Sequence, residues 1–178
     1  MKTLIGIYSG YNQARIGLGS IFKENLADRK SANVLILEQV VVNTIKEGRG
    51  ADNKEIAGDI REQGWGAGQI DIKELKPEQL SWLDHFIADH KCLSFAEIRH
   101  LCYSGNYLSQ IIQQSIANGN NSILSILKST GIQDYKAQIA VEKIQQGCVF
   151  FWITTEDNKL DDLIQLLKNT NGELIQTI

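Results

Sequence analysis

The sequence contains few of the residues that mark disulfide-rich or membrane-spanning proteins. Among its 178 residues are one proline, one methionine and three cysteines. Three is an odd number, so no even disulfide framework is expected, and a chain of this length can bury a core without one. No apolar run reaches the roughly 18 residues of a membrane-spanning helix, and the first residues lack a signal-peptide pattern. We therefore expect a cytoplasmic protein with no transmembrane segment, whereas a peripheral membrane contact stays open.

A surplus of positive charge is also missing. Eighteen lysines and arginines face 21 aspartates and glutamates, which leaves a formal net charge of -3 at pH 7. A nucleic-acid binder needs a cationic surface that displaces the counterions of the phosphates. The composition therefore argues against a general nucleic-acid binder.

Catalytic signatures are the third absence. The chain has no Gly-x-Ser-x-Gly elbow, no Gly-x-Gly-x-x-Gly run and no P-loop. These patterns position a nucleophile or bind phosphates, so their absence removes the commonest enzyme classes that a sequence reveals. We expect a non-enzymatic protein without a cofactor.

Strand and helix patterns alternate at the start of the chain. Residues 3–8 are apolar and β-branched, and residues 34–42 contain a nearly continuous apolar run. Between them, Ala14, Leu18 and Ile21 recur at helical spacing. This order predicts a strand, a helix and a second strand.

The end of the chain repeats that order. Residues 149–154 predict a strand, residues 160–167 a helix with an apolar stripe, and residues 173–178 a closing strand. Two such units predict an α+β protein with a ferredoxin-like split βαβ sheet and a central helical insertion. We expect the sheet to be built from residues 1–45 and 130–178.

The middle of the chain divides into two parts. Residues 46–74 are expected to form a Gly-rich loop with a short strand, because six of the fifteen glycines lie in its first 23 residues. Residues 75–129 show helical spacing and predict a helical insertion. Within it, Ser94 and Glu97 have the spacing of a capping box, which predicts a helix at 94–102.

A further helix is predicted at residues 133–145. Four apolar residues share one of its faces, and we expect that face to be buried. They are Tyr135, Ile139, Ala140 and Ile144.

The two ends also carry a family resemblance. The C-terminal part contains Gly131-Ile132, a helix reaching Gly147, the strand 148–154 and the ending 172–178. Together these features resemble bacterial general-stress and membrane-associated proteins of unknown function. The start is similar at residues 4–8 and Ala14. In that family the βαβ ends flank a Gly-rich apolar hairpin, whereas this chain has polar helices in its place. The resemblance implies a ferredoxin-like fold, a stress-related role and a buried or self-associating central segment.

One segment carries no charge. The 28 residues between Arg99 and Lys128 contain no Asp, Glu, Lys or Arg, although amides are frequent. Interface cores are depleted of charged side chains. We therefore predict a regulatory or protein-interaction module that forms a homo-oligomer or binds a protein partner. The expected interaction residues are Tyr107, Gln110, Gln113 and Gln114, together with Trp65 of the Gly-rich loop.

A cluster of histidines and cysteines predicts an alternative function. His90, Cys92, His100 and Cys102 supply the imidazole and thiolate donors that zinc prefers in a tetrahedral site. A single residue separates the histidine from the cysteine in each pair. On a helix this spacing points the two side chains in different directions, so it suits a tetrahedral site poorly. A zinc sensor is one hypothesis for this cluster, and a catalytic role or accidental clustering with Cys102 in the core are the others.

A helix-turn-helix regulator is the third hypothesis. Helices at 94–102 and 107–118 are loosely similar to winged helix-turn-helix proteins, and Gln and Asn side chains can pair with adenine. The second helix has none of the Lys or Arg that bind phosphates. This hypothesis therefore requires a basic face from distant residues, which are Arg15, Lys23, Arg29 and Lys30.

Overall fold

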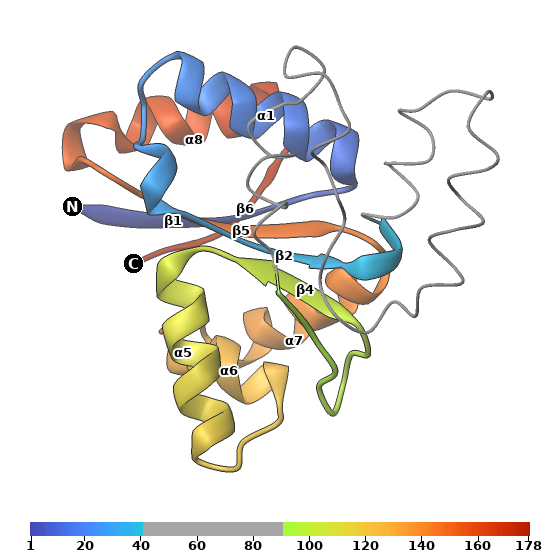
Figure 1. Ribbon diagram of the computed structural model, residues 1–178. Coiled ribbons are helices and arrows are strands. Elements are labelled where there is room, and N and C mark those ends of the chain that lie inside the picture. Colours follow the sequence, from blue (N-terminus) through green and yellow to red (C-terminus); the bar gives the residue numbers. More distant parts are fainter. Residues whose placement is uncertain (41–90) are drawn as a thin grey trace, which may run out of the picture.

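The computed structural model describes residues 1–40 and 91–178. These residues form one sheet with helices on both faces, and the predicted α+β class is confirmed (Figure 1). The strands are β1 (Lys2–Tyr8), β2 (Ala32–Leu37), β3 (Lys91–Leu93), β4 (Leu101–Ser104), β5 (Val149–Thr155) and β6 (Glu173–Thr177). The helices are α1 (Tyr11–Lys23), α5 (Asn106–Ala117), α6 (Ile123–Ser129), α7 (Asp134–Gln145) and α8 (Leu160–Asn169), with 3-10 turns η1 (Arg29–Ser31) and η4 (Asp157–Lys159).

The sheet has the strand order β3-β4-β2-β5-β1-β6, and every neighbouring pair is antiparallel. β5 lies between β1 and β2, and β1 lies between β5 and β6. The two βαβ units are therefore split, each by a strand of the other, which is the predicted ferredoxin-like arrangement. β3 and β4 extend this sheet beyond β2.

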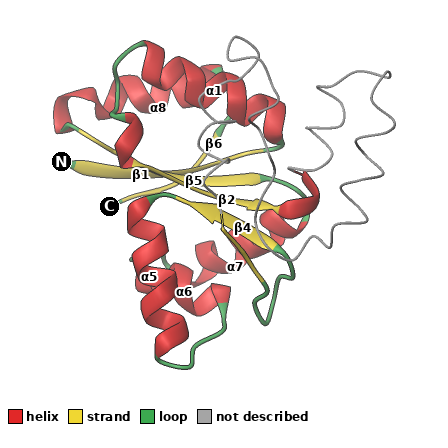
Figure 2. Cartoon of the chain, viewed as in Figure 1, coloured by secondary structure: helices red, strands yellow, loops and turns green. Residues whose placement is uncertain are grey.

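The helices cover the two faces of the sheet unequally. Figure 2 shows α1 and α8 on one side and α5, α6 and α7 on the other. Successive residues of a strand point to opposite faces. On β5, Phe151 and Ile153 belong to the core under α1 and α8, whereas Phe150 and Trp152 belong to the core under α5 to α7. A strand covered on both faces explains the continuous apolar run of β5.

Two sequence predictions, at residues 34–42 and 94–102, need correction. The predicted helix at 94–102 is wrong, because this segment contains a turn with buried Phe95 and Ile98 and then enters β4. The strand predicted at 34–42 ends at Leu37, and residues 38–40 are helical. Antiparallel pairing of β4 with β2 supplies backbone hydrogen bonds that outweigh the local capping signal.

The predicted buried face of α7 is partly wrong. Tyr135 is 59% exposed and Ile139 is 39% exposed. Ala140 and Ile144 are buried as predicted, and Ala137 and Val141 complete the face that packs on the sheet.

Several predicted features lie outside the described residues. They are most of the Gly-rich loop with Trp65, the short strand after it, the helices expected before residue 90, and His90.

Candidate functional site

A disulfide joins the two strands of the β3–β4 hairpin. Cys92 of β3 and Cys102 of β4 are directly opposite in the antiparallel ladder, and their sulfurs are bonded at 2.09 Å. Cys102 is fully buried and pairs on its other side with Ile36 of β2. Cys92 is only partly buried. The odd number of cysteines did not predict this bond, which forms because the hairpin places the two cysteines opposite each other.

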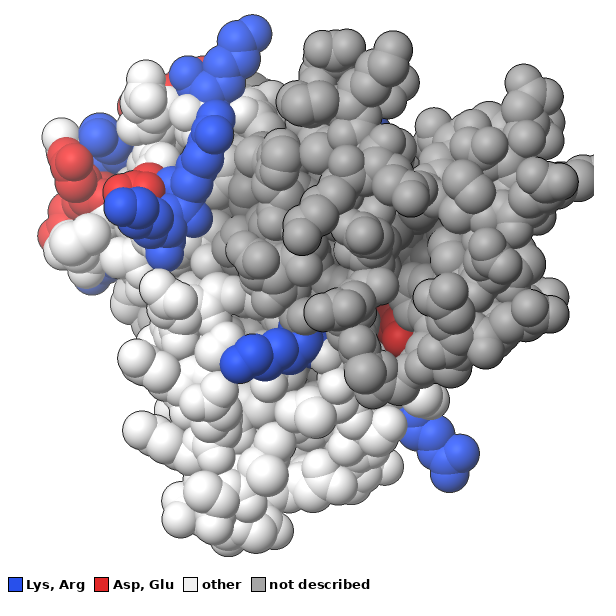
Figure 3. All heavy atoms as spheres, viewed as in Figure 1, with Lys and Arg blue, Asp and Glu red and all other residues white. Residues whose placement is uncertain are grey.

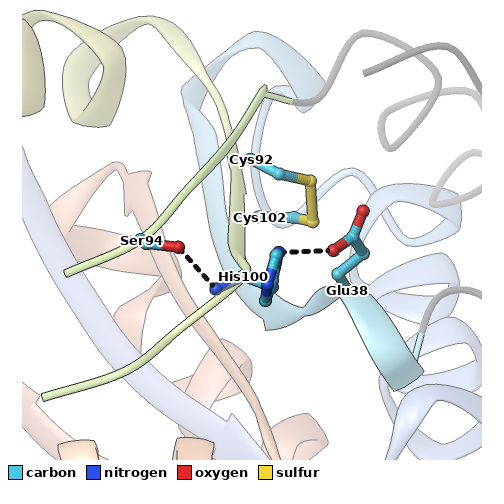
Figure 4. Close-up of a disulfide and its surroundings, with 5 residues drawn as sticks. All are labelled: Glu38, Cys92, Ser94, His100 and Cys102. Carbon is cyan, nitrogen blue, oxygen red and sulfur yellow. Dashed lines mark hydrogen bonds and ion pairs between the residues drawn. A yellow bond between two sulfur atoms is a disulfide. The ribbon is translucent and has the colours of Figure 1, made fainter. Parts of the chain in front are cut away.

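His100 immediately precedes β4, the return strand of this hairpin. Its φ of 54° lies in the left-handed region that few residues other than glycine adopt. Its carbonyl accepts a hydrogen bond from the Glu38 N–H at 2.9 Å, and its Nδ1 lies 3.1 Å from Oε2 of Glu38. Its own N–H lies 3.4 Å from Oγ of Ser94. These contacts hold the hairpin to the residue after β2 without using the disulfide (Figure 4).

The structure does not assemble the predicted zinc ligands. Zinc binds cysteine as a thiolate, whereas the sulfurs of Cys92 and Cys102 are bonded to each other. His100 pairs with Glu38, and His90 lies outside the described residues. In residues 1–40 and 91–178 no group of three or more His, Cys, Asp or Glu side chains is placed to hold a metal. Zinc binding by these residues stays a prediction.

The tip of the hairpin is anchored to α6 by Glu97. One carboxylate oxygen accepts a hydrogen bond from the Ser122 hydroxyl, and the other accepts one from the Ile123 N–H at 2.9 Å. The Ser122 oxygen in turn accepts from the Ser125 N–H at 3.1 Å. The capping box predicted from Ser94 and Glu97 is therefore wrong, because Glu97 caps a helix that begins 26 residues later.

Removing this anchor is expected to destabilise the protein moderately. In Glu97→Ala the buried Ile123 N–H loses its partner, and we expect the free energy of unfolding to fall by about 1–2 kcal/mol. Urea unfolding followed by circular dichroism measures this change. Glu142→Ala, at an exposed position of α7, is the matched control and should stay within about 0.5 kcal/mol of the parent. Equal losses in the two variants would contradict the capping role.

The buried side chain of Asn33 positions α5. Its Oδ1 accepts a hydrogen bond from the Leu108 N–H at 3.0 Å, which satisfies one free donor of the first helical turn. Gly105 joins β4 to this helix with a φ of 111°, and a Cβ there would collide with Asn33. Leu108 and Ile112 of the helix are fully buried against the sheet.

The opposite side of α5 faces outward and carries no charge. Tyr107 is 43% exposed and Ile116 is 44% exposed. We call these two residues, with the exposed Gln110, Gln113 and Gln114, the α5 surface. In Figure 3 the lower left part of the molecule, over α5 and α6, shows neither blue nor red atoms. The structure thus brings four of the predicted interaction residues onto one helix, and Trp65 lies outside the described residues.

The basic residues required by the helix-turn-helix hypothesis lie elsewhere. Arg15 and Lys23 are on α1, which covers the sheet face opposite to α5 (Figure 1). Arg29 and Lys30 are in η1, which contacts β5. With a hairpin in place of the first predicted helix, the expected helix-turn-helix is not formed at residues 94–118.

A hollow of ≈ 520 Å³ opens between the end of α1, η1 and the end of β5. Asp28 and Glu156 line it together with Arg29 and Lys159, so charges of both signs are present. Lys159 already pairs with Glu156 at 3.1 Å. The lining of the hollow therefore has no excess of one sign among these four side chains.

Two residues of the site had no signal in the sequence. Asn33 binds a partner 75 positions away, and Glu38 contacts His100 across the end of the sheet. The cysteine pair did have a signal, because the separation of 10 residues suits two strands joined by a short connection. The Ser94 and Glu97 capping pattern pointed to a helix instead.

The fold and the site define an α+β sandwich with an oxidised hairpin and an uncharged helix on one face. Within the described parts of the chain, no helix is long and apolar enough to cross a membrane. No family model, curated protein or solved structure matches this chain. The resemblance to bacterial general-stress proteins therefore stays a prediction.

Proposed function

We propose that this chain is a protein-interaction module that self-associates through the α5 surface. The observation that carries the proposal is an exposed helical surface without charge in a chain of which 22% of the residues are charged. Interface cores are depleted of charged residues and enriched in tyrosine, which Tyr107 supplies here. Solvated helix surfaces, by contrast, normally carry Lys and Glu.

The chemistry of this surface favours a second copy of the chain as the partner. A two-fold interface pairs the same patch of both subunits, and residues close to its axis face their own copies. A charged residue there would face a like charge, whereas a glutamine amide both donates and accepts and can pair with itself. Gln110, Gln113 and Gln114 all have this property.

The helix is also held firmly enough to present a fixed surface. Asn33 secures its first turn, and Leu108 and Ile112 anchor it in the core. A surface that is ordered before binding loses less conformational entropy on association. The α5 surface therefore satisfies both the chemical and the mechanical requirement of an interface.

Charge introduced on this surface is expected to disrupt the dimer. In the double variant Gln113→Glu/Gln114→Glu, like charges face each other across the interface, and the dimer Kd should rise at least about tenfold. Size-exclusion chromatography with light scattering measures the mass over a concentration series. High salt should partly restore the dimer, because it screens the repulsion.

The control is Gln138→Glu, which makes the same chemical change at an exposed position of α7 and should leave the dimer intact. Two results would overturn the proposal. One is a wild-type protein that stays monomeric at the highest concentration, and the other is a dimer that the double variant does not weaken.

A further inference from the structure

We infer that the Cys92–Cys102 bond is a reversible thiol–disulfide site whose reaction partner is a dithiol reductant. Cys92 lies on β3 at one end of the described sheet and is only partly buried, whereas Cys102 is fully buried. Of the two residues, Cys92 therefore offers an attacking thiolate the better access. Exposed disulfides are the labile ones, whereas enclosed disulfides resist reduction, so we place the attack at the partly exposed Cys92.

The exchange runs in two balanced steps. A thiolate of the reductant attacks Sγ of Cys92, the S–S bond breaks, and the electron pair leaves on Sγ of Cys102, which takes up a proton. The second thiolate of the reductant then attacks its own sulfur in the mixed disulfide and releases Cys92, which also takes up a proton. One disulfide and one dithiol become two cysteine thiols and one oxidised reductant.

Only β3 depends on this bond for its place in the sheet. Among the described strands β3 pairs with β4 alone, over three residues, which is the lower limit for a strand. β4 is held independently by four residue pairs with β2. The hairpin tip is held by buried Phe95 and Ile98 and by the Glu97 contacts to α6. Reduction should therefore release β3 and leave β4, the hairpin tip and α5 in place.

This behaviour also fits the predicted compartment. Disulfides in reducing compartments are usually transient and catalytic or redox-sensing, whereas structural ones belong to secreted proteins.

The free Cys148 serves as an internal reference, because burial raises the pKa of its thiol and thiol reactivity follows the thiolate fraction.

Alkylation under a controlled redox potential tests the site on the full chain. The protein is equilibrated at several ratios of reduced to oxidised dithiothreitol, trapped with N-ethylmaleimide and mapped by mass spectrometry. We expect Cys92 and Cys102 to become alkylated together as the ratio of reduced to oxidised dithiothreitol rises. The near-ultraviolet circular dichroism should stay native, and the labelling of Cys148 should not depend on this ratio. Hydrogen exchange in residues 91–94 should rise at least tenfold on reduction, with β1 and β5 unchanged.

Three results would overturn the inference. The first is a disulfide that is reduced only in denaturant. The second is a pair of cysteines that is alkylated without reductant and does not form the disulfide with oxidised glutathione. The third is a reduction that unfolds the whole chain. None of these results depends on the α5 surface.

Variants that lack one cysteine of the pair test the direction of attack. With the modified residue identified by mass spectrometry, Cys92 in Cys102→Ala should form a mixed disulfide with oxidised glutathione at least tenfold faster than Cys102 does in Cys92→Ala. Both variants are first checked for native circular dichroism. Equal rates in two folded variants would refute the assignment of Cys92 as the attacked residue.

Discussion

Phe151→Ala is expected to lower the free energy of unfolding by about 3–5 kcal/mol. Phe151 is fully buried on β5, which pairs with β1 and β2. Its ring stacks on Tyr8 at a centroid distance of 5.4 Å and covers Gly6, where a Cβ would lie 2.5 Å from the ring. Alanine would leave a cavity at the centre of the sheet, and the rigid backbone pairs on both sides prevent its collapse.

Urea unfolding followed by circular dichroism measures this loss. Phe151→Leu should cost less than half as much, because leucine refills most of the space. The exposed Tyr135→Ala is the control and should change stability by no more than about 0.5 kcal/mol. A loss at Tyr135 equal to that at Phe151 would instead support the buried face that periodicity predicted for α7.

Asn33→Ala is expected to cost about 2–3 kcal/mol, although it removes only one polar group. The Leu108 N–H would be left buried without its acceptor, and the first turn of α5 would lose its cap. The Asn33 amide also donates to the Ser31 carbonyl at 3.3 Å, so a second contact disappears. Urea unfolding gives the energy, and hydrogen exchange should show faster exchange in the first turn of α5.

Asn118→Ala supplies the comparison for Asn33. It makes the same chemical change at the exposed end of α5 and should stay within about 0.5 kcal/mol of the parent. An Asn33→Ala protein as stable as this control, with unchanged exchange in α5, would show that Asn33 does not position the helix.

The elements at the two ends of the chain could be predicted because their signals are local. β5 is a compact apolar run, and α1 buries Ala14, Leu18 and Ile21 at the spacing expected from the sequence. Periodicity reports which residues of one element share a face, so it succeeds where an element faces a single core.

The same reasoning failed where partners are distant in sequence. Glu97 has the spacing of a local cap, yet its carboxylate binds Ser122 and Ile123. The pairing of β4 with β2 decided the conformation of that segment. Local propensity is a weak prior that tertiary contacts override, and here they turned a predicted helix into a hairpin.

The α5 surface, too, could be predicted only in part from the sequence. The absence of charge between Arg99 and Lys128 is visible in the sequence and already indicated an interaction surface. It did not show which of those residues are exposed, because exposure depends on how α5 packs on the sheet. The buried Leu108 and the exposed Tyr107 are adjacent in sequence, and only the packing separates them.

The sequence by itself determined the α+β class, the split βαβ ends and the uncharged central segment, because composition and periodicity are properties of short stretches of chain. The tertiary structure alone decided that Cys92 faces Cys102, that Glu38 meets His100 and that Asn33 caps α5. Each of these contacts joins residues from different elements. Their proximity comes from the strand order of the sheet, which no single segment encodes.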